Sequence, residues 1–333
     1  MLIQPFSHSN TKKIPKSVIM MLDTVNFKIT QEEVEGVSFL EELPQYLEED
    51  SLGIHDYNGM PVVTGNLEGL KVSVNRFQVK IGNGSLCKYL LGDNFQCMGR
   101  ADIKQAVEKI SDTLHLPMNL ASVTRLDIAD NIIVKHPVSV YLNHLGMMKA
   151  HSRLQQPDSV YYTGKESTLL FYNKVKEQRA KREPIPEVFS NANVLRYEQR
   201  FTHKLESALH VPRVTGALLY EEKFYIDMLN RWREAYQSIS KINEIVLNFQ
   251  AMTTKQQMYK MGVLSMVERV GGEVAMINQI ADAQRRGELT TKQAYDLRQA
   301  VKDACKIREG LTRPSEAITE LDAKIAQAIR FYR

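Results

Sequence analysis

The chain has 333 residues, of which 43% are hydrophobic, and a formal net charge of +4, so it is long enough for one large domain or two domains. Its three cysteines are too few and too scattered for a disulfide framework or a zinc cluster, which predicts a reducing, cytoplasmic setting. No segment reaches the roughly 20 apolar residues of a membrane span, so we expect a soluble protein without a membrane partner.

The first two thirds of the chain read as strands with inserted helices. Residues 23–30 alternate between apolar and polar, as a half-buried strand does. Residues 69–84 alternate twice and end in a Gly-Asn-Gly turn signal, which predicts strands joined by a hairpin. Apolar residues recur at helical spacing over 101–116, and Pro117 ends this predicted helix.

The middle of the chain continues this pattern. Residues 122–134 are strand-like, and residues 136–148 read as a helix with Pro137 near its start. Two more strands are predicted at 167–174 and 193–201, separated by a charged stretch that contains prolines. These elements predict an antiparallel sheet with helices packed on one face.

From about residue 217 the strand patterns disappear. Helices are predicted near 218–248, 254–269, 273–286 and 291–309, with a last one after Pro314. We therefore place a domain boundary near 210–217, which divides the chain into residues 1–212 and 213–333. The expected fold class is α+β, with an all-helical C-terminal domain after the sheet domain.

Positive charge is concentrated in one segment. Between Lys149 and Arg213 there are twelve Lys or Arg and seven Asp or Glu, a balance of +5, whereas the rest of the chain has a balance of −1. A localised basic surface is expected of a protein that binds a phosphate backbone. A solvated face without a ligand explains the charge equally well.

Three of the predicted strands carry a polar face opposite an apolar one, because side chains alternate along a strand. The polar sets are Arg125 and Asp127; Tyr172 and Lys174; and Arg196, Glu198 and Arg200. If these faces align on one sheet, they bring together two carboxylates, a phenol and several cations. A solvated sheet surface with cross-strand ion pairs is the alternative for each strand taken alone.

The combined set suits transesterification of a phosphodiester. Asp127 and Glu198 offer hard oxygen ligands for Mg²⁺ or Mn²⁺, which would polarise the phosphate. Tyr172 would attack phosphorus and form a covalent phosphotyrosine. Tyrosine ionises near pH 10, so it needs help from a metal, from a base or from a cation such as Lys174. Arginines can hold the phosphate or pair with the carboxylates.

The same strands resemble a known family. In order and spacing, "SVTRLDIADNIIV", "STLLFYNKVKEQ" and "NVLRYEQRF" resemble the replication initiators of filamentous phages, the gene II/gene X family. The plasmid rolling-circle initiators of the Rep_trans type share a similar trio. The likeness covers roughly residues 65–205. It implies a rolling-circle initiator or relaxase-like fold for residues 1–212. Residues 213–333 do not obviously match this family, and DNA binding, dimerisation or bracing is expected of them from their helical pattern.

The resemblance also implies an activity. It predicts a replication initiation protein, a site-specific, metal-dependent DNA endonuclease that nicks one strand, stays linked to the 5′ end and later rejoins it. Carried over by position, the nucleophile falls on Tyr172, with Lys174 after it. The acids fall on Asp127 and Glu198, beside Arg125 and Arg196. Expected partners are duplex and single-stranded origin DNA of a phage or plasmid, a host helicase and polymerase, and a second copy in a homodimer.

Some features depart from related enzymes. No two histidines are two residues apart, so a histidine-pair metal site is excluded, and His203 is a weaker candidate ligand. Asp130 is expected on the opposite strand face from Asp127, and Tyr162 is a rival nucleophile. Further candidate phosphate contacts are Arg200, Lys165 and Lys176.

The C-terminal helices allow a helix-turn-helix, with residues 291–304 as a recognition helix that carries Lys292, Arg298 and Lys302. Dimerisation and bracing of the catalytic domain are the alternatives. Two other functions also stay open: a conjugative or mobilisation relaxase, and a non-catalytic DNA-binding regulatory protein.

Overall fold

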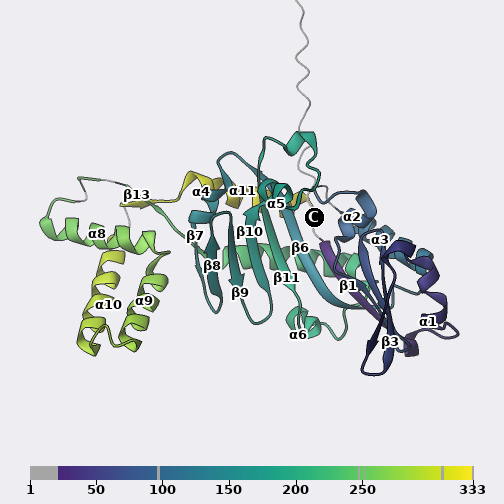
Figure 1. Ribbon diagram of the computed structural model, residues 1–333. Coiled ribbons are helices and arrows are strands. Elements are labelled where there is room, and N and C mark those ends of the chain that lie inside the picture. The colour runs from purple at the N-terminus through teal and green to yellow at the C-terminus, as the bar shows by residue number, and fades with distance from the viewer. Residues whose placement is uncertain (1–21, 96–97, 247, 251, 309–310, 332–333) are drawn as a thin grey trace, which may run out of the picture.

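The structure is a computed structural model that describes residues 22–95, 98–246, 248–250, 252–308 and 311–331. Its centre is a ten-stranded sheet in which every neighbouring pair is antiparallel (Figure 1). In sheet order the strands are β2 (Gly53–Tyr57), β3 (Met60–Leu67), β4 (Leu70–Val74), β5 (Gln78–Gly82), β1 (Leu22–Thr30), β6 (Ser122–Val134), β11 (Asn193–Phe201), β10 (Thr168–Asn173), β9 (Ser159–Thr163) and β8 (Ser152–Gln156). The α+β class with a large antiparallel sheet is confirmed.

Two small sheets and eleven α-helices complete the described part of the chain. The small sheets pair β7 (Leu145–Met148) with β12 (Ile239–Lys241) and β13 (Glu244–Ile245) with β14 (Thr312–Arg313). The helices are α1 (Phe39–Glu42), α2 (Leu86–Leu91), α3 (Arg100–Leu114), α4 (Val138–Asn143), α5 (Lys174–Lys181), α6 (Leu205–Leu209), α7 (Glu222–Gln237), α8 (Lys255–Arg269), α9 (Glu273–Arg285), α10 (Thr291–Cys305) and α11 (Glu316–Phe331). None of the described helices is long and apolar enough to cross a bilayer.

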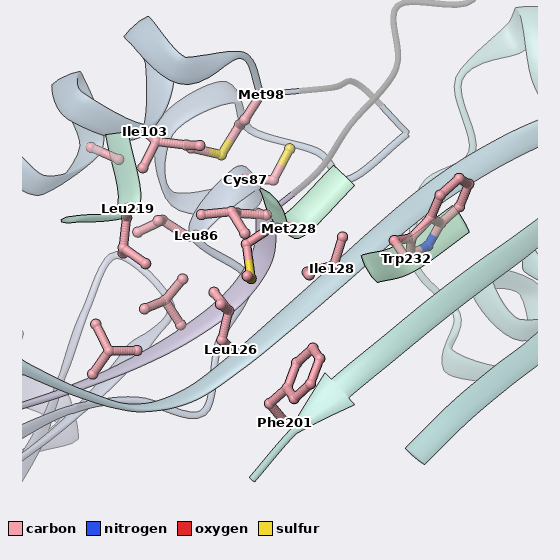
Figure 2. Packing of buried hydrophobic residues seen from close by; sticks show 14 of the residues in the cluster. Leu86, Cys87, Met98, Ile103, Leu126, Ile128, Phe201, Leu219, Met228 and Trp232 are labelled. Carbon is pink, nitrogen blue, oxygen red and sulfur yellow. The ribbon is translucent and has the colours of Figure 1, made fainter. Parts of the chain in front are cut away.

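The main hydrophobic core lies between one face of the sheet and the helices α3, α4, α7 and α11. Ile103 of α3, Leu126 and Ile128 of β6 and Trp232 of α7 belong to it, as Figure 2 shows. Behind the centre of the sheet, the ring of Tyr197 stacks between Phe171 and Trp232, with ring centroids 4.2 and 4.5 Å away. Stacked aromatic rings of this kind fix the position of β10 and β11 against α7.

The helices after residue 217 fall into two groups. Helices α7 and α11 pack into the main core, whereas α8, α9 and α10 have small cores of their own, to one side of the sheet (Figure 1). The boundary predicted near 210–217 therefore runs through a continuous core. Helices at the C-terminal end of the chain are found as expected, but the strands β12, β13 and β14 lie among them.

Two predicted helices are shorter than expected. The helix predicted over 136–148 ends at Asn143, and residues 145–148 form β7. The helix predicted over 218–248 ends at Gln237, and residues 239–241 form β12. These two strands pair with each other, so a contact between distant segments overrides the local helical pattern in both. Neither strand is long enough to show an alternation that a sequence could reveal.

Candidate active site

The strand register places the three polar faces on the same side of the sheet. Tyr172 lies opposite Arg196 in the β10–β11 pair, and Arg200 lies opposite Asp127 in the β11–β6 pair. Residues directly opposite each other in an antiparallel pair point to the same face. Glu198, two residues from Arg196, shares this face, which is the one turned away from the main core.

Tyr172 is held by a carboxylate. Its hydroxyl donates a hydrogen bond to Oε1 of Glu198 over 2.7 Å, and the side chain is half-buried at the wall of a cleft. Burial, together with the negative charges of Glu198 and Glu177, raises the pKa of Tyr172 well above its ordinary value. The hydroxyl is therefore protonated in the free protein, and its direction is set by Glu198.

Glu198 is buried and forms ion pairs with two arginines. Nε of Arg196 lies 2.6 Å from Oε1, and Nη2 of Arg200 lies 2.6 Å from Oε2. Burial alone would raise the pKa of Glu198, but the charges of Arg196 and Arg200 outweigh it and lower this pKa to about 2. Glu198 is consequently ionised and a weak base while both arginines stay in place.

Asp127 has a similar partner. Nε and Nη2 of Arg125 lie 2.9 and 2.6 Å from its two carboxylate oxygens, and Nε of Arg200 lies 3.7 Å from Oδ2. Burial raises the pKa of Asp127, although Arg125 opposes this shift. Arg200 therefore lies between the two predicted acids and joins them into one network.

Arg196 is fully buried and contacts an acid that sequence reasoning missed. Its Nη2 lies 2.8 Å from Oδ2 of Asp23, and its Nη1 donates to Asn131 over 3.1 Å. Because Arg196 does not line the cleft, its place does not fit the predicted phosphate contact. Arg196 instead forms ion pairs with both Asp23 and Glu198 and so fixes these two carboxylates beneath the wall of the cleft.

Asp23 was missed because of a bulge in β1. Strict alternation places Asp23 on the same face as Val25 and Ile29, which are core residues. The β1–β6 register shifts between Leu22 and Val25, which marks a bulge. Because of this bulge, the side chains of Leu22 and Val25 both reach the core, and Asp23 turns toward the polar face. A bulge of this kind has no reliable sequence signal.

Lys174 starts α5 rather than ending β10. The Asn173 side chain accepts a hydrogen bond from Lys176 N and so caps this helix. Nζ of Lys174 is buried, lies 2.9 Å from Oε2 of Glu177, and lines the cleft near Tyr172. Burial, with the charge of Arg196, lowers the pKa of Lys174. Lys174 therefore lies near Tyr172 as expected, but as the first residue of a helix and not as part of the strand.

The other candidates are spread over several environments. Lys176 lines the cleft and pairs with Asp158 over 2.7 Å, whereas Lys165 is exposed in the β9–β10 turn, away from the cleft. His203 is exposed after β11 and does not line the cleft either. Asp130 lies opposite Tyr197 on the core face, as expected.

On β9, the expected rival nucleophile Tyr162 points into the core, and its neighbour Tyr161 points toward the cleft. Tyr162 is fully buried in the core and donates a hydrogen bond to the Gly146 carbonyl over 2.7 Å. Tyr161 lies opposite Leu170 on the polar face and lines the cleft. Tyr161, and not Tyr162, is therefore the rival nucleophile that the fold offers.

The cleft that these residues share has a volume of about 920 Å³. Six cations line it, and each is within ion-pair distance of a carboxylate that also lines it. The cations are Lys88, Arg125, Lys174, Lys176, Lys181 and Arg200. The cleft therefore has dense charge but little net charge.

The carboxylates of this cleft do not form a ready metal site. Asp127 and Glu198 supply oxygen ligands of the kind that Mg²⁺ prefers, but arginines already occupy both of them. Within the described ranges, no group of three His, Cys, Asp or Glu side chains is placed to hold a metal ion. A divalent ion bound here would have to displace Arg200 or Arg125.

The predicted recognition helix corresponds to α10. Lys292 and Lys302 are exposed on it, while Nη1 of Arg298 donates to Gln284 of α9 over 3.2 Å. Two cations thus stay open to solvent on this helix. A role of α10 in reading DNA stays a prediction.

Comparison with protein families gives one match. The family model for the N-terminal region of the gene II-type replication-associated protein matches residues 21–233, which include the whole ten-stranded sheet and most of α7. Comparison with curated proteins gives no match. The match spans well over half of the 333 residues and contains every residue of the network around Tyr172. The chain therefore belongs to the filamentous-phage gene II-type family of replication initiators.

Proposed function

We propose that the chain initiates rolling-circle replication by nicking and rejoining one DNA strand through a covalent bond to Tyr172. The observation that carries this proposal is the hydrogen bond from the Tyr172 hydroxyl to Glu198, inside a cleft that is also lined by Arg125 and Arg200. A tyrosine nucleophile splits strand transfer into two reversible steps. The family match supports a role in replication, and the site supports this chemistry for it.

In the first step, Oη of Tyr172 attacks the scissile phosphorus and the bond from phosphorus to the 3′ oxygen breaks. The electron pair of that bond goes to the 3′ oxygen, which takes up a proton and leaves as a free 3′ hydroxyl. The proton of Tyr172 is released in the same step. One phosphodiester replaces another, so the reverse reaction rejoins the strand without an outside energy source.

Arg200 links phosphate binding to removal of the tyrosine proton. In the free protein Arg200 pairs with Glu198 and is about one third exposed at the cleft wall. A phosphate that attracts Arg200 draws positive charge away from Glu198, which raises its pKa and makes it a better proton acceptor. Lys174, whose pKa is lowered, supplies a second group for proton transfer in the same cleft.

Dependence on Mg²⁺ or Mn²⁺ stays a prediction from the family resemblance. Because the carboxylates are held by arginines, no step of the reaction above is assigned to a metal. Adduct formation in the presence of EDTA, compared with Mg²⁺ or Mn²⁺, tests it directly.

The test of the proposal is formation of a covalent protein–DNA adduct. The wild-type chain and the variant Tyr172→Phe are incubated with single-stranded oligonucleotides that tile the replicon carrying the gene. We expect a wild-type adduct whose DNA-linked peptide contains Tyr172, and no adduct with Tyr172→Phe. The matched control is Tyr161→Phe, which removes the other hydroxyl that lines the cleft and is expected to keep the adduct.

Two outcomes would overturn this assignment. An adduct that survives Tyr172→Phe but disappears with Tyr161→Phe would move the nucleophile to β9. Absence of any wild-type adduct on the whole oligonucleotide set, with DNA binding intact, would favour the non-catalytic DNA-binding function. A relaxase would use the same chemistry, so it differs in substrate: its adduct would form on a transfer origin instead of a replication origin.

A further inference from the structure

A second groove lies on the polar face of the sheet, beside the cleft. It has a volume of about 520 Å³ and is formed by β3, β4, β5 and β1 with one residue of β6. Asn83 lines both the groove and the cleft, so the two hollows adjoin. Asn26, which lines the groove, lies directly opposite Arg125 in the β1–β6 pair. The groove is therefore on the same face of the sheet as the network around Tyr172.

The charge of this groove differs from that of the cleft. Among the described residues, three lysines line it, Lys28, Lys71 and Lys80, and no Asp or Glu does. Lys71 and Lys80 are exposed and Lys28 is half-buried. Within the described part of the chain, none of the three forms an ion pair or a hydrogen bond with a carboxylate. These ammonium groups are therefore available to a ligand.

Two of the lysines face each other. Lys28 of β1 and Lys80 of β5 are directly opposite in the antiparallel register. Like charges in this position destabilise a sheet, because the side chains are about 5 Å apart at their Cβ atoms. An anion between them would turn the repulsion into attraction. The arrangement therefore favours a ligand that carries closely spaced negative charge.

The rest of the lining indicates the kind of ligand. The other side chains are mainly small and polar, including Thr64, Asn66, Ser73 and Thr124, which suit contacts to phosphate and sugar oxygens. Phe27 is the one aromatic residue of the lining, and it is buried, so it offers no surface for stacking bases. Grooves for single strands usually combine cations with such stacking surfaces. The lining therefore fits a stacked duplex contacted through its backbone.

We propose that this groove binds the sugar–phosphate backbone of duplex DNA next to the strand that enters the cleft. This inference rests on the proposed action on DNA, and it adds residues of β1, β4 and β5 to the DNA-binding surface. A duplex carries one negative charge per about 1.7 Å of axis, so lysines on three adjacent strands would meet several phosphates. The contacts are to phosphates, so the groove positions the duplex without reading its sequence.

The test measures binding of the full chain to a 30-base-pair duplex and to a 30-nucleotide single strand at several salt concentrations. The variant is Lys28→Gln/Lys71→Gln/Lys80→Gln. We expect duplex binding at about 0.1 M salt to weaken by roughly tenfold or more, and the slope of log K against log salt to fall by about three, one for each lost contact. Single-strand binding should change by less than about threefold.

The matched control is Lys104→Gln/Lys223→Gln/Lys324→Gln, which removes the same charge from the helices α3, α7 and α11. It should leave the salt slope unchanged. A second variant, Lys28→Arg/Lys71→Arg/Lys80→Arg, keeps the charge and should keep duplex binding. Thermal unfolding of each variant shows whether it is folded.

Three results would overturn the proposal: equal losses in the groove variant and its control, a loss in the arginine variant, or a loss confined to the single strand. The last result would assign the groove to a single strand instead. The outcome is independent of the nicking proposal, because a wild-type chain that forms no adduct still gives a readable binding measurement.

Discussion

The two halves of the sheet use positive charge in different ways. On β6, β11 and β10, every cation that lines the cleft is within reach of a carboxylate, and the buried Arg196 holds two acids at once. On β4, β5 and β1, three lysines line a groove that contains no acid. Fixed charges orient a nucleophile, whereas free charges bind a ligand. Under the two proposals above, the chemistry takes place in the cleft and the duplex binds in the groove.

The comparison also bears on the charge distribution along the sequence. The segment from Lys149 to Arg213 holds the excess positive charge of the chain. Many of its cations, including Lys174, Lys181 and Arg200, are used in ion pairs around the cleft. The lysines of the groove come from residues 28–80, outside that segment. If the groove binds phosphates as proposed, the binding surface lies outside the segment with the excess positive charge.

The largest expected effect is on stability and concerns Arg196. Arg196→Met leaves buried Asp23 without the charge of Arg196 and removes one of the two arginines that pair with Glu198, which should reduce the free energy of unfolding by about 3–5 kcal/mol. Arg125→Met is the comparison, because Arg125 is partly exposed and Arg200 stays near Asp127, so a smaller loss is expected. Urea unfolding of both variants measures the difference. Equal losses would show that burial does not distinguish the two arginines.

The next effect concerns Glu198 and pH. Its pKa falls from an ordinary 4.5 to about 2 on folding, so it contributes about 3 kcal/mol of stability that is fully present above pH 4.5. That contribution is lost as pH falls from 4.5 through 2, since the proton then binds the folded protein as well. We expect the stability advantage of wild type over Glu198→Gln to shrink over this range.

The groove supplies the control for the pH experiment. The stability difference between wild type and Lys28→Gln should stay constant between about pH 5 and 2, because none of the described residues that line the groove is a carboxylate. A wild-type advantage over Glu198→Gln that is equally constant would contradict the lowered pKa of Glu198.

The smallest effect is expected in the groove itself. Lys80→Glu places a carboxylate opposite Lys28 and should raise the free energy of unfolding of the free protein by about 0.5 kcal/mol. The same change should weaken duplex binding, so stability and binding move in opposite directions. Thermal unfolding and the duplex titration together measure this. A variant that is both less stable and equally good at binding would show that the Lys28–Lys80 pair carries no strain and no ligand.

The strands of the site were the most predictable part of the molecule. The sequence pattern places β6 and β11 at the bounds that the structure has, and it aligns Asp127, Tyr172 and Glu198 on one face. This works because each of these long strands turns an apolar face to the main core and a polar face away from it, which gives the sequence a period of two. The period depends only on local chain geometry, so it can be followed in a single sequence.

The parts that were missed depend on contacts between distant segments. A bulge in β1 turns Asp23 toward the cleft, and the pairing of β7 with β12 replaces two helix ends. Tyr161 faces the cleft and Tyr162 faces the core because pairing with β10 sets the register of β9. The two adjacent tyrosines in the sequence give no sign of that pairing. The groove could not be predicted without the sheet order, because its lysines come together only when β4 and β5 lie next to β1.

The position of α11 has a consequence for how the protein is made. Ile318, Leu321 and Ile325 belong to the same core as strands that begin at residue 22, so this layer of the molecule joins segments almost 300 residues apart in sequence. During translation this part of the core stays uncovered until the ribosome has passed residue 331. A growing chain therefore exposes the apolar surface that α11 covers until residues 316–331 have been synthesised, and we expect it to be prone to aggregation up to that point.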